Sequence, residues 1–299
     1  MAVYVNTNVS SLNGRRYLNN VQNQLTTTYQ RLSSGLRINS AKDDAAGLQI
    51  SSRLTTQING LNQGNRNSSD GIALAQTIEG AMDEMTGMLQ KIRTLAVQAS
   101  NGTNTEADRK ALDTEATALV AEIDRIASQT KFGGKTILDG ADKGKNSIYM
   151  GDKGSVGQLT LQVGANKGDT ISFDVANMKF TKIMTAANIA VTKSWDNGKK
   201  LILSTAEGAQ AVIELMDKMI GVVDSQRAGL GAIQNRLESS IRNQANVSAN
   251  QSDARSRIRD ADFAEESANL SQQSIIQQAA TSMLMQANTR PQLGLSLLG

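Results

Sequence analysis

Two of the side chains that most often carry out chemistry in proteins are missing from this sequence. Its 299 residues include no histidine and no cysteine. Their absence excludes Ser-His and Cys-His nucleophile pairs, disulfides, thiolate chemistry and most zinc or transition-metal sites. Two reactive patterns remain to be weighed, a fragment of a phosphate-binding loop and three pairs of adjacent carboxylates.

The phosphate-loop fragment is Gly134-Lys135-Thr136. A phosphate-binding loop has a first glycine five positions before the second one, follows a strand and opens a helix. Gln129 occupies the position of that first glycine, and the segment follows a stretch with helical periodicity. We therefore expect no nucleotide site and no cofactor.

The adjacent carboxylates are Asp43-Asp44, Asp83-Glu84 and Glu265-Glu266. Neighbouring residues on a helix do not face each other, so these pairs do not form catalytic dyads by themselves. We interpret them as solvated or helix-capping side chains. Without a catalytic pair, a nucleophile–base pair or a metal site, the chain is not expected to be an enzyme.

Composition favours slender helices packed side by side. Hydrophobic residues make up 39% of the chain but aromatic residues only 3%, and aromatic side chains dominate the energetics of compact cores. The net charge is +3 with both signs interleaved, which argues against a nucleic-acid partner. No apolar run has the length of a membrane span, and the first residues lack the pattern of a secretory signal.

The helices needed to organise this chain begin at its two ends. A narrow apolar stripe predicts an N-terminal helix that runs to about Leu32 and stops at Gly35, and a last helix begins near Asp260 to Asp262 and closes at Pro291. Such helices gain little stability alone, so we expect them to pair and to be completed by neighbouring copies. The predicted self-assembly residues are Leu18, Val21, Leu25, Leu32, Leu270, Ile276, Met283 and Leu284.

Longer helices are predicted between the ends. A helix over about Ala45 to Leu61 either stops or continues into a strongly periodic stretch from Ile72 to Ala99. Thr105 to Asp108 resembles a capping box and opens the next helix. The helical period returns at Ala206 and lasts about 40 residues, or roughly 60 Å at 1.5 Å per residue.

Strand-like alternation appears only in the middle of the chain. Residues 157–164 and 170–176 alternate apolar and polar side chains, which predicts strands in hairpins. Residues 177–204 are weakly patterned, with a turn at 195–198, and are predicted to be a short surface insert. The hydroxyl side chains of this insert either accept O-linked glycans or form a plain polar surface, and both alternatives stay open. The candidate acceptors are Thr181, Thr185, Thr192 and Ser194.

The predicted fold is mostly α: paired, coiled-coil-like N- and C-terminal helices, a bundle of long helices, and a small β-hairpin-rich middle. We expect a terminal-helix domain from residues 1–43 and 255–299. A long-helix domain with hairpins would use residues 44–176 and 205–254, with the insert 177–204 between its two parts.

Several motifs in this chain resemble those of bacterial flagellins, and in the same order. They include QRLSSGLRINSAKDDAAGLQIS (30–51), LQKIRTLAVQASNGT (89–103), EIDRIASQTKFGGKTILDG (122–140) and LTLQVGANKGDTISFDV (159–175). Toward the C-terminus they include LGAIQNRLESSI (230–241), SRIRDADFAEE (256–266) and LSLL (295–298). The resemblance covers nearly the whole chain and is far more specific than any single short pattern.

The resemblance implies a structural subunit that polymerises into the helical flagellar filament used for swimming. The terminal helices would build an inner tube and the long helices an outer one, without the large outer domains of bigger family members. It also implies secretion by the flagellar type III export apparatus, an export chaperone for the C-terminal helix, and contacts with filament cap and hook-junction proteins.

The resemblance also implies recognition by the Toll-like receptor for flagellin. The matching positions are Lys91, Leu95, Gln98 and Glu115, with lysine at the position where the pattern usually has arginine. The apolar tail at Leu295, Leu297 and Leu298 matches the segment associated with cytosolic inflammasome sensing.

Two other functions fit the sequence less well than a filament subunit. A hook–filament junction protein shares the terminal patterns, but the close match at residues 89–103 favours the filament subunit. A secreted surface hydrolase or adhesin is disfavoured because the chain has no histidine and no phosphate loop.

Overall fold

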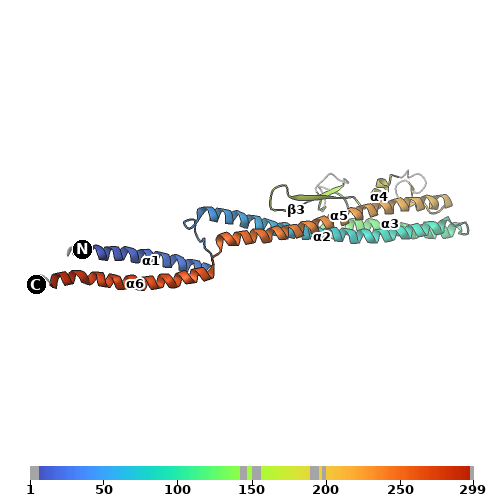
Figure 1. Cartoon of the computed structure of the whole chain (residues 1–299). Coiled ribbons are helices and arrows are strands. Elements are labelled where there is room, and N and C mark those ends of the chain that lie inside the picture. The colour runs from blue at the N-terminus through green and yellow to red at the C-terminus, as the bar shows by residue number, and fades with distance from the viewer. Residues whose placement is uncertain (1–6, 142–146, 150–155, 189–194, 197–199, 297–299) are drawn as a thin grey trace. The chain divides into compact units, whose positions relative to one another are not determined.

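A computed structural model describes residues 7–141, 147–149, 156–188, 195–196 and 200–296. Mostly helical, as predicted, the chain divides into two compact units (Figure 1). The terminal-helix unit comprises Met1–Ile58 and Ser248–Gly299, and the long-helix unit comprises Asn59–Val247. The helices are α1 (Val9–Ser34), α2 (Ala45–Ser100), α3 (Glu106–Gln129), α4 (Phe180–Ala186), α5 (Ala206–Arg259) and α6 (Phe263–Ser296). The strands are β1 (Lys131–Phe132), β2 (Lys135–Thr136), β3 (Gly157–Gln162), β4 (Thr170–Val175), β5 (Trp195–Asp196) and β6 (Lys200–Leu201).

The first helix begins and ends at the residues that its sequence favours. The Asn8 side chain accepts a hydrogen bond from the Ser11 backbone N–H at 3.0 Å, which caps the N-terminus of α1. At the other end Gly35 takes a left-handed conformation with φ of 69° and donates its N–H to the Arg31 carbonyl. The predicted glycine stop is therefore confirmed.

The connector after α1 is tied to the junction between α5 and α6. Leu36 forms an isolated antiparallel bridge with Asp260, and the Arg37 N–H donates to the Arg259 carbonyl at 2.7 Å. Ile38 is fully buried. These backbone bonds join segments that are more than 200 residues apart in sequence, so they help to hold the two ends of the chain together.

The structure decides between the two alternatives for the second helix, and two helix boundaries differ from the sequence-based expectation. The polar stretch after Leu61 does not interrupt α2, which runs on to Ser100. The fifth helix has 54 residues, more than the roughly 40 expected from its period, and ends at Arg259. Finally, Pro291 does not close α6, which continues to Ser296. The glycines of the polar stretch lie against residues 161–165, and the Asn8 side chain of α1 contacts α6 one turn before Pro291.

The core of the long-helix unit lies between α2, α3 and α5. The apolar stripes predicted from the sequence point into it, and their most buried members are Ile78, Met82, Met85, Leu89, Ile92, Ile123, Met216, Met219 and Leu237. The buried methionines are therefore core side chains, as their helical spacing predicts. Two ion pairs cross from α2 to α5 at the surface, Arg93 with Asp217 and Asp83 with Arg227.

The hairpin β3–β4 is antiparallel, with Leu159 opposite Phe173. Its turn lies against a face of α2 that has no large side chains. Asn67 of α2 donates its side-chain amide to the Gln162 carbonyl at 2.8 Å, and Gln244 of α5 donates to the Val163 carbonyl. Glycines at 60, 64 and 71 leave the space for this approach, because an added Cβ at each would fall within 3 Å of hairpin atoms.

The segment predicted to be a surface insert contributes to the core instead of only covering it. Met178, Phe180 and Ile183 are buried in and beside the unpredicted helix α4, and Leu201 of β6 and Leu203 just after it are also buried. The segment has no long apolar stripe, so its periodicity does not reveal that these described apolar side chains are buried.

The capping box at α3 is present as predicted. Thr105 Oγ1 accepts from the Asp108 N–H, and the Asp108 carboxylate accepts from the Thr105 N–H at 3.0 Å. The Thr105 hydroxyl also donates to this carboxylate, and these bonds lower the pKa of Asp108 below its ordinary value of 3.8.

The pKa of Asp108 is lowered on folding, so the ionised Asp108 carboxylate stabilises the folded protein. This stabilisation is complete above pH 3.8 and is lost as the pH falls through the pKa of Asp108 in the folded protein. We expect Asp108→Ala to lower the urea midpoint of the monomer at neutral pH. The same variant should lose less on acidification than the parent. Circular dichroism at 222 nm, recorded at neutral pH and below pH 3.8, measures both; equal acid dependence in the two proteins would contradict the assignment.

Candidate functional site

The two terminal helices pack along one face of each, which we call the seam. On α1 the seam carries Val21, Leu25 and Thr28, all buried, with Leu18 and Leu32 half-buried. Across it, Thr28 donates its hydroxyl to the Gln273 side-chain oxygen at 3.2 Å. On α6 the predicted residues Leu270 and Leu284 are half-buried. The seam is thin, so little apolar surface is buried between α1 and α6 alone.

An ion pair closes the seam near the connector. Arg31 Nη1 lies 2.9 Å from Glu266 Oε1, and the Glu266 side chain is only 8% exposed against 31% for Arg31. A buried carboxylate without a partner would be costly. The second member of the Glu265-Glu266 pair is therefore a structural acid held by α1, and not one half of a catalytic dyad.

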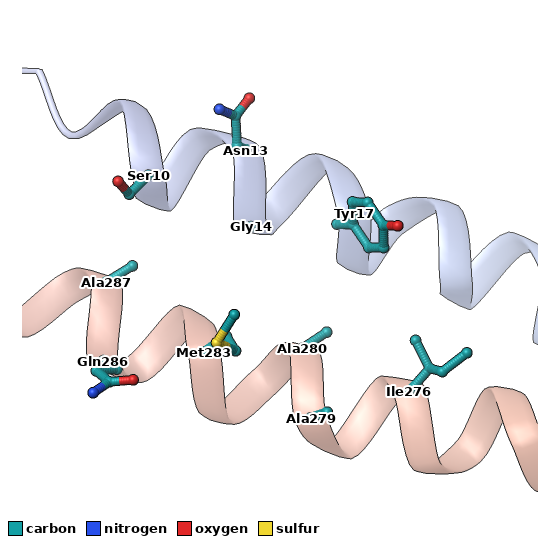
Figure 2. Close-up of a pocket in the computed structure, with 10 residues that line it drawn as sticks. All are labelled: Ser10, Asn13, Gly14, Tyr17, Ile276, Ala279, Ala280, Met283, Gln286 and Ala287. Carbon is teal, nitrogen blue, oxygen red and sulfur yellow. The ribbon is translucent and has the colours of Figure 1, made fainter.

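Beside the seam, α1 and α6 enclose an open groove of about 570 Å³, which we call the terminal groove (Figure 2). Its lining residues are Ser10, Asn13, Gly14 and Tyr17 of α1 and Ile276, Ala279, Ala280, Met283, Gln286 and Ala287 of α6. Tyr17 is 67% exposed and Met283 is 68% exposed. Two of the predicted self-assembly residues, Ile276 and Met283, thus lie outside the seam and face solvent.

Further apolar side chains on this unit have no cover within the chain. The exposed ones are Val9, Leu12, Tyr29, Ile50, Phe263, Ile275 and Met285. Exposed apolar side chains scattered singly are ordinary, but Tyr17, Ile276 and Met283 gather in one apolar groove, which marks an interaction surface. The long-helix unit has fewer large exposed apolar side chains, namely Val97, Val156 and Val247 among its described residues.

The groups that the sequence offers for catalysis are used structurally. Lys135 and Thr136 form β2 of a tight hairpin whose turn glycines, Gly133 and Gly134, have φ values of 57° and 82°. A strand follows them where a phosphate-binding loop would need a helix. Asp43 accepts from the N–H groups of Asn39 and Ser40, and these bonds lower the pKa of Asp43.

Within the described ranges, no three His, Cys, Asp or Glu side chains are grouped so that they could hold a metal ion. None of the helices in the described part of the chain is both long enough and apolar enough to cross a membrane.

The four positions carried over for immune recognition are only partly brought together on a surface. Lys91 and Glu115 form an ion pair at 2.9 Å between α2 and α3, and both are exposed. Gln98 is also exposed, whereas Leu95 is buried in the core. Sequence spacing alone places Leu95 on the same helix, but it does not reveal that the side chain points inward.

The candidate glycan acceptors divide in a similar way. Thr181 and Thr185 lie exposed on α4, and the Thr185 hydroxyl donates to the Thr181 carbonyl at 2.8 Å. Thr192 and Ser194 lie outside the described residues.

Two family-level sequence profiles match two separate parts of this chain, one toward each end. One is described as the bacterial flagellin N-terminal helical region and matches residues 5–143. The other is described as the bacterial flagellin C-terminal helical region and matches residues 213–298. The matched ranges contain the seam, the terminal groove and most of the long-helix core.

Individual relatives extend the similarity to the full chain. Polar flagellin C of Vibrio parahaemolyticus is 37% identical over an alignment of 383 positions that covers all of both proteins. Flagellin A of Vibrio anguillarum is 38% identical over 378 positions, again covering both. These alignments are longer than the 299 residues here, so each relative has residues with no counterpart in this chain.

Solved structures are more distant. A flagellin from Bacillus cereus is 28% identical, with a TM-score of 0.46, and covers 60% of this chain and 88% of its own. A structure assigned as a flagellar hook-associated protein from Vibrio parahaemolyticus has a TM-score of 0.56 over 73% of this chain and all of its own. At 15% identity that second likeness concerns the fold alone.

Proposed function

This chain belongs to the bacterial flagellin family and is a structural subunit of the flagellar filament, and we propose that its copies join through the terminal groove. The observation that carries this proposal is the exposure of Tyr17 and Met283 on paired helices whose seam is too thin to stabilise them well. A neighbouring subunit that filled the groove would remove this apolar surface from water.

Burial of apolar side chains has to offset the conformational entropy that the terminal helices lose when they become ordered. Ordering a residue costs roughly 1–2 kcal/mol of backbone entropy, while burying a large apolar side chain returns roughly 1.5–3 kcal/mol. Few large side chains are buried in the seam, so the pair gains most of its stability when the exposed ones are also covered. We therefore propose that the terminal helices order on assembly, driven by heterologous contacts that repeat along an open helix. An unchanged far-UV circular dichroism spectrum after polymerisation would argue against this ordering.

Methionine oxidation offers a direct test because the exposed and buried methionines are well separated. Peroxide converts exposed methionine to its sulfoxide. Met283 and Met285 are the exposed methionines among the described residues, whereas Met82 and Met216 are fully buried in the long-helix core. We expect Met283 to oxidise about tenfold faster in dissociated subunits than in filaments, as measured by peptide mass spectrometry.

Met82 and Met216 are the internal controls for this experiment, since they should oxidise slowly in both states. Equal oxidation of Met283 in subunits and filaments would mean that the terminal groove stays open to solvent after assembly. That result would refute the groove as the contact while leaving the family assignment intact.

We also propose the finer partners implied by the flagellin resemblance. Before assembly, α6 exposes Phe263, Ile275 and Met285, which suits a chaperone that shields this helix until type III export delivers the subunit outside the cell. Filament cap and hook-junction proteins would then contact the same terminal-helix unit. Failure of the purified chain to bind a flagellin export chaperone from the same cells would refute that part of the proposal.

The exposed polar positions on α2 and α3 support a receptor contact. We propose that Lys91, Gln98 and Glu115 are accessible to the Toll-like receptor for flagellin and that Leu95 acts only by supporting the helix from within. Lysine does not reproduce the planar fork of arginine, so Lys91→Arg should strengthen binding. An unchanged receptor titration would contradict this assignment.

Thr181 and Thr185 remain candidate glycan acceptors, and intact mass spectrometry of native filaments tests them.

A further inference from the structure

The proline in α6 has an unusual partner on the other terminal helix. Pro291 lies inside α6 and has no backbone N–H, so it cannot donate to the carbonyl of Ala287, four residues earlier. That carbonyl accepts a hydrogen bond from Asn8 Nδ2 at 2.7 Å. The acceptor that the proline leaves without its usual donor is thus occupied by a side chain from α1.

The same asparagine also caps α1. Its Oδ1 accepts from the Ser11 N–H at 3.0 Å while its Nδ2 reaches Ala287. One amide therefore satisfies one N–H at the start of α1 and the carbonyl that lacks a helical donor in α6, and each end of the amide faces the group it needs.

Two neighbouring contacts depend on the same alignment of the helices. The Ser11 hydroxyl donates to Asn288 Oδ1 at 2.6 Å. One turn further along, Gly14 lies so close to α6 that an added Cβ would sit 3.0 Å from a methyl carbon of Leu284. All three contacts fall within four turns of the end of the pair, next to the residues of the terminal groove.

We propose that Asn8 is the residue that sets the register between α1 and α6, and that Pro291 provides the acceptor that makes this register unique. Along a regular helix every interior carbonyl already accepts a backbone N–H, so a side chain from a partner helix meets a row of equivalent acceptors, each with one lone pair in use. The missing donor at Pro291 marks one carbonyl out of the series. This inference rests on the proposed function, because its consequence is for assembly.

The register matters because the terminal groove is built from both helices. A shift of α6 by one residue turns its side chains by about 100°. Met283 and Ala287 would then leave the groove, and the surface offered to the next subunit would change. Asn8 therefore acts as a positioning residue for the groove, although it does not line the groove itself.

The discriminating variant is Asn8→Ser in the full chain. Serine caps helices about as well as asparagine, but its short side chain does not reach the Ala287 carbonyl. If Asn8 only caps α1, the critical concentration for seeded filament growth should not change. If it sets the register, the critical concentration should rise about tenfold, which corresponds to ~1.4 kcal/mol. Thr105→Ser, a cap substitution on α3, is the matched control and should grow like the parent.

Rescue by Pro291→Ala separates the proposed role from a general structural defect. Alanine restores an N–H that can donate to the Ala287 carbonyl, so that carbonyl no longer depends on Asn8. In the Pro291→Ala background, we expect Asn8→Ser to raise the critical concentration by less than about threefold. An equal rise in both backgrounds would overturn the proposed link between Asn8 and the proline.

A spectroscopic measurement on unsubstituted filaments covers the case in which a variant fails to assemble. Solid-state NMR of filaments labelled with ¹⁵N-asparagine and 1-¹³C-alanine should give a side-chain amide to Ala287 carbonyl correlation, and a spectrum without it would overturn the inference. Failure of the parent chain to assemble under any condition would count against the proposed function instead. Normal growth of both the parent and Asn8→Ser would count against the register role alone.

Discussion

Replacing Gly64 by alanine should destabilise the long-helix unit by about 2–4 kcal/mol, although alanine is the better helix former. An added Cβ at Gly64 would lie only 2.0 Å from the Val163 carbonyl oxygen, a backbone atom that cannot move aside alone. The hairpin turn would have to lift away from α2. Its hydrogen bonds from Asn67 and Gln244 would then weaken or break.

The same helix supplies a control with the opposite expected sign. Gly80 and Gly87 also lie within α2, but an added Cβ at either would meet no atom within 4 Å. Alanine there should stabilise the unit by up to about 1 kcal/mol, because glycine is the poorer helix former. Thermal unfolding of the monomer should place the melting temperature of Gly64→Ala roughly 4–16 °C below the parent and that of Gly80→Ala slightly above it. A raised melting temperature for Gly64→Ala would show that the hairpin does not rest on this face.

The face of α2 that carries Gly60, Gly64 and Gly71 could not be predicted from sequence periodicity. The stripes of α2 and α5 were predictable because one side of each helix repeats large apolar residues, and those residues are the ones buried. The region after Leu61 is polar and contains glycines, so periodicity alone leaves open whether the helix stops there. Its glycines serve instead as close contact points for a hairpin about 100 residues later, and periodicity carries no information on such a partner.

Pro291 illustrates the same limit from the other direction. A proline near the end of a periodic stretch is ordinarily a sound stop signal, because it removes one helical hydrogen bond. Here α6 continues to Ser296, and Asn8 donates to the Ala287 carbonyl that the proline leaves without its helical donor. The terminal groove was likewise only half predictable. Ile276 and Met283 were placed among the assembly residues from their spacing, but their separation from the seam formed by Val21 and Leu25 needed the structure.

Replacing Met283 by glutamate should abolish filament assembly while leaving the subunit folded. The side chain is 68% exposed in the single chain, so a carboxylate there remains hydrated before assembly. If a neighbouring subunit fills the terminal groove, the carboxylate loses that water and finds no described cation among the groove residues. Burying an unpaired charge costs several kcal/mol, and each 1.4 kcal/mol is a factor of ten. The critical concentration should therefore rise by more than about 100-fold.

Two further variants separate loss of the groove from the other effects of a charge. Met283→Gln introduces polarity without charge and should raise the critical concentration much less. Gln278→Glu adds the same charge at an exposed position of α6 that does not line the groove, and it should assemble close to normally. Sedimentation of seeded reactions measures all three, and urea unfolding of the monomers checks that the long-helix unit is intact. Normal assembly of Met283→Glu would mean that no subunit enters this groove, because a buried unpaired carboxylate would raise the critical concentration. Equal loss in Met283→Glu and Gln278→Glu would instead extend the contact around the whole of α6, since only burial on both sides could make the two charges equally costly.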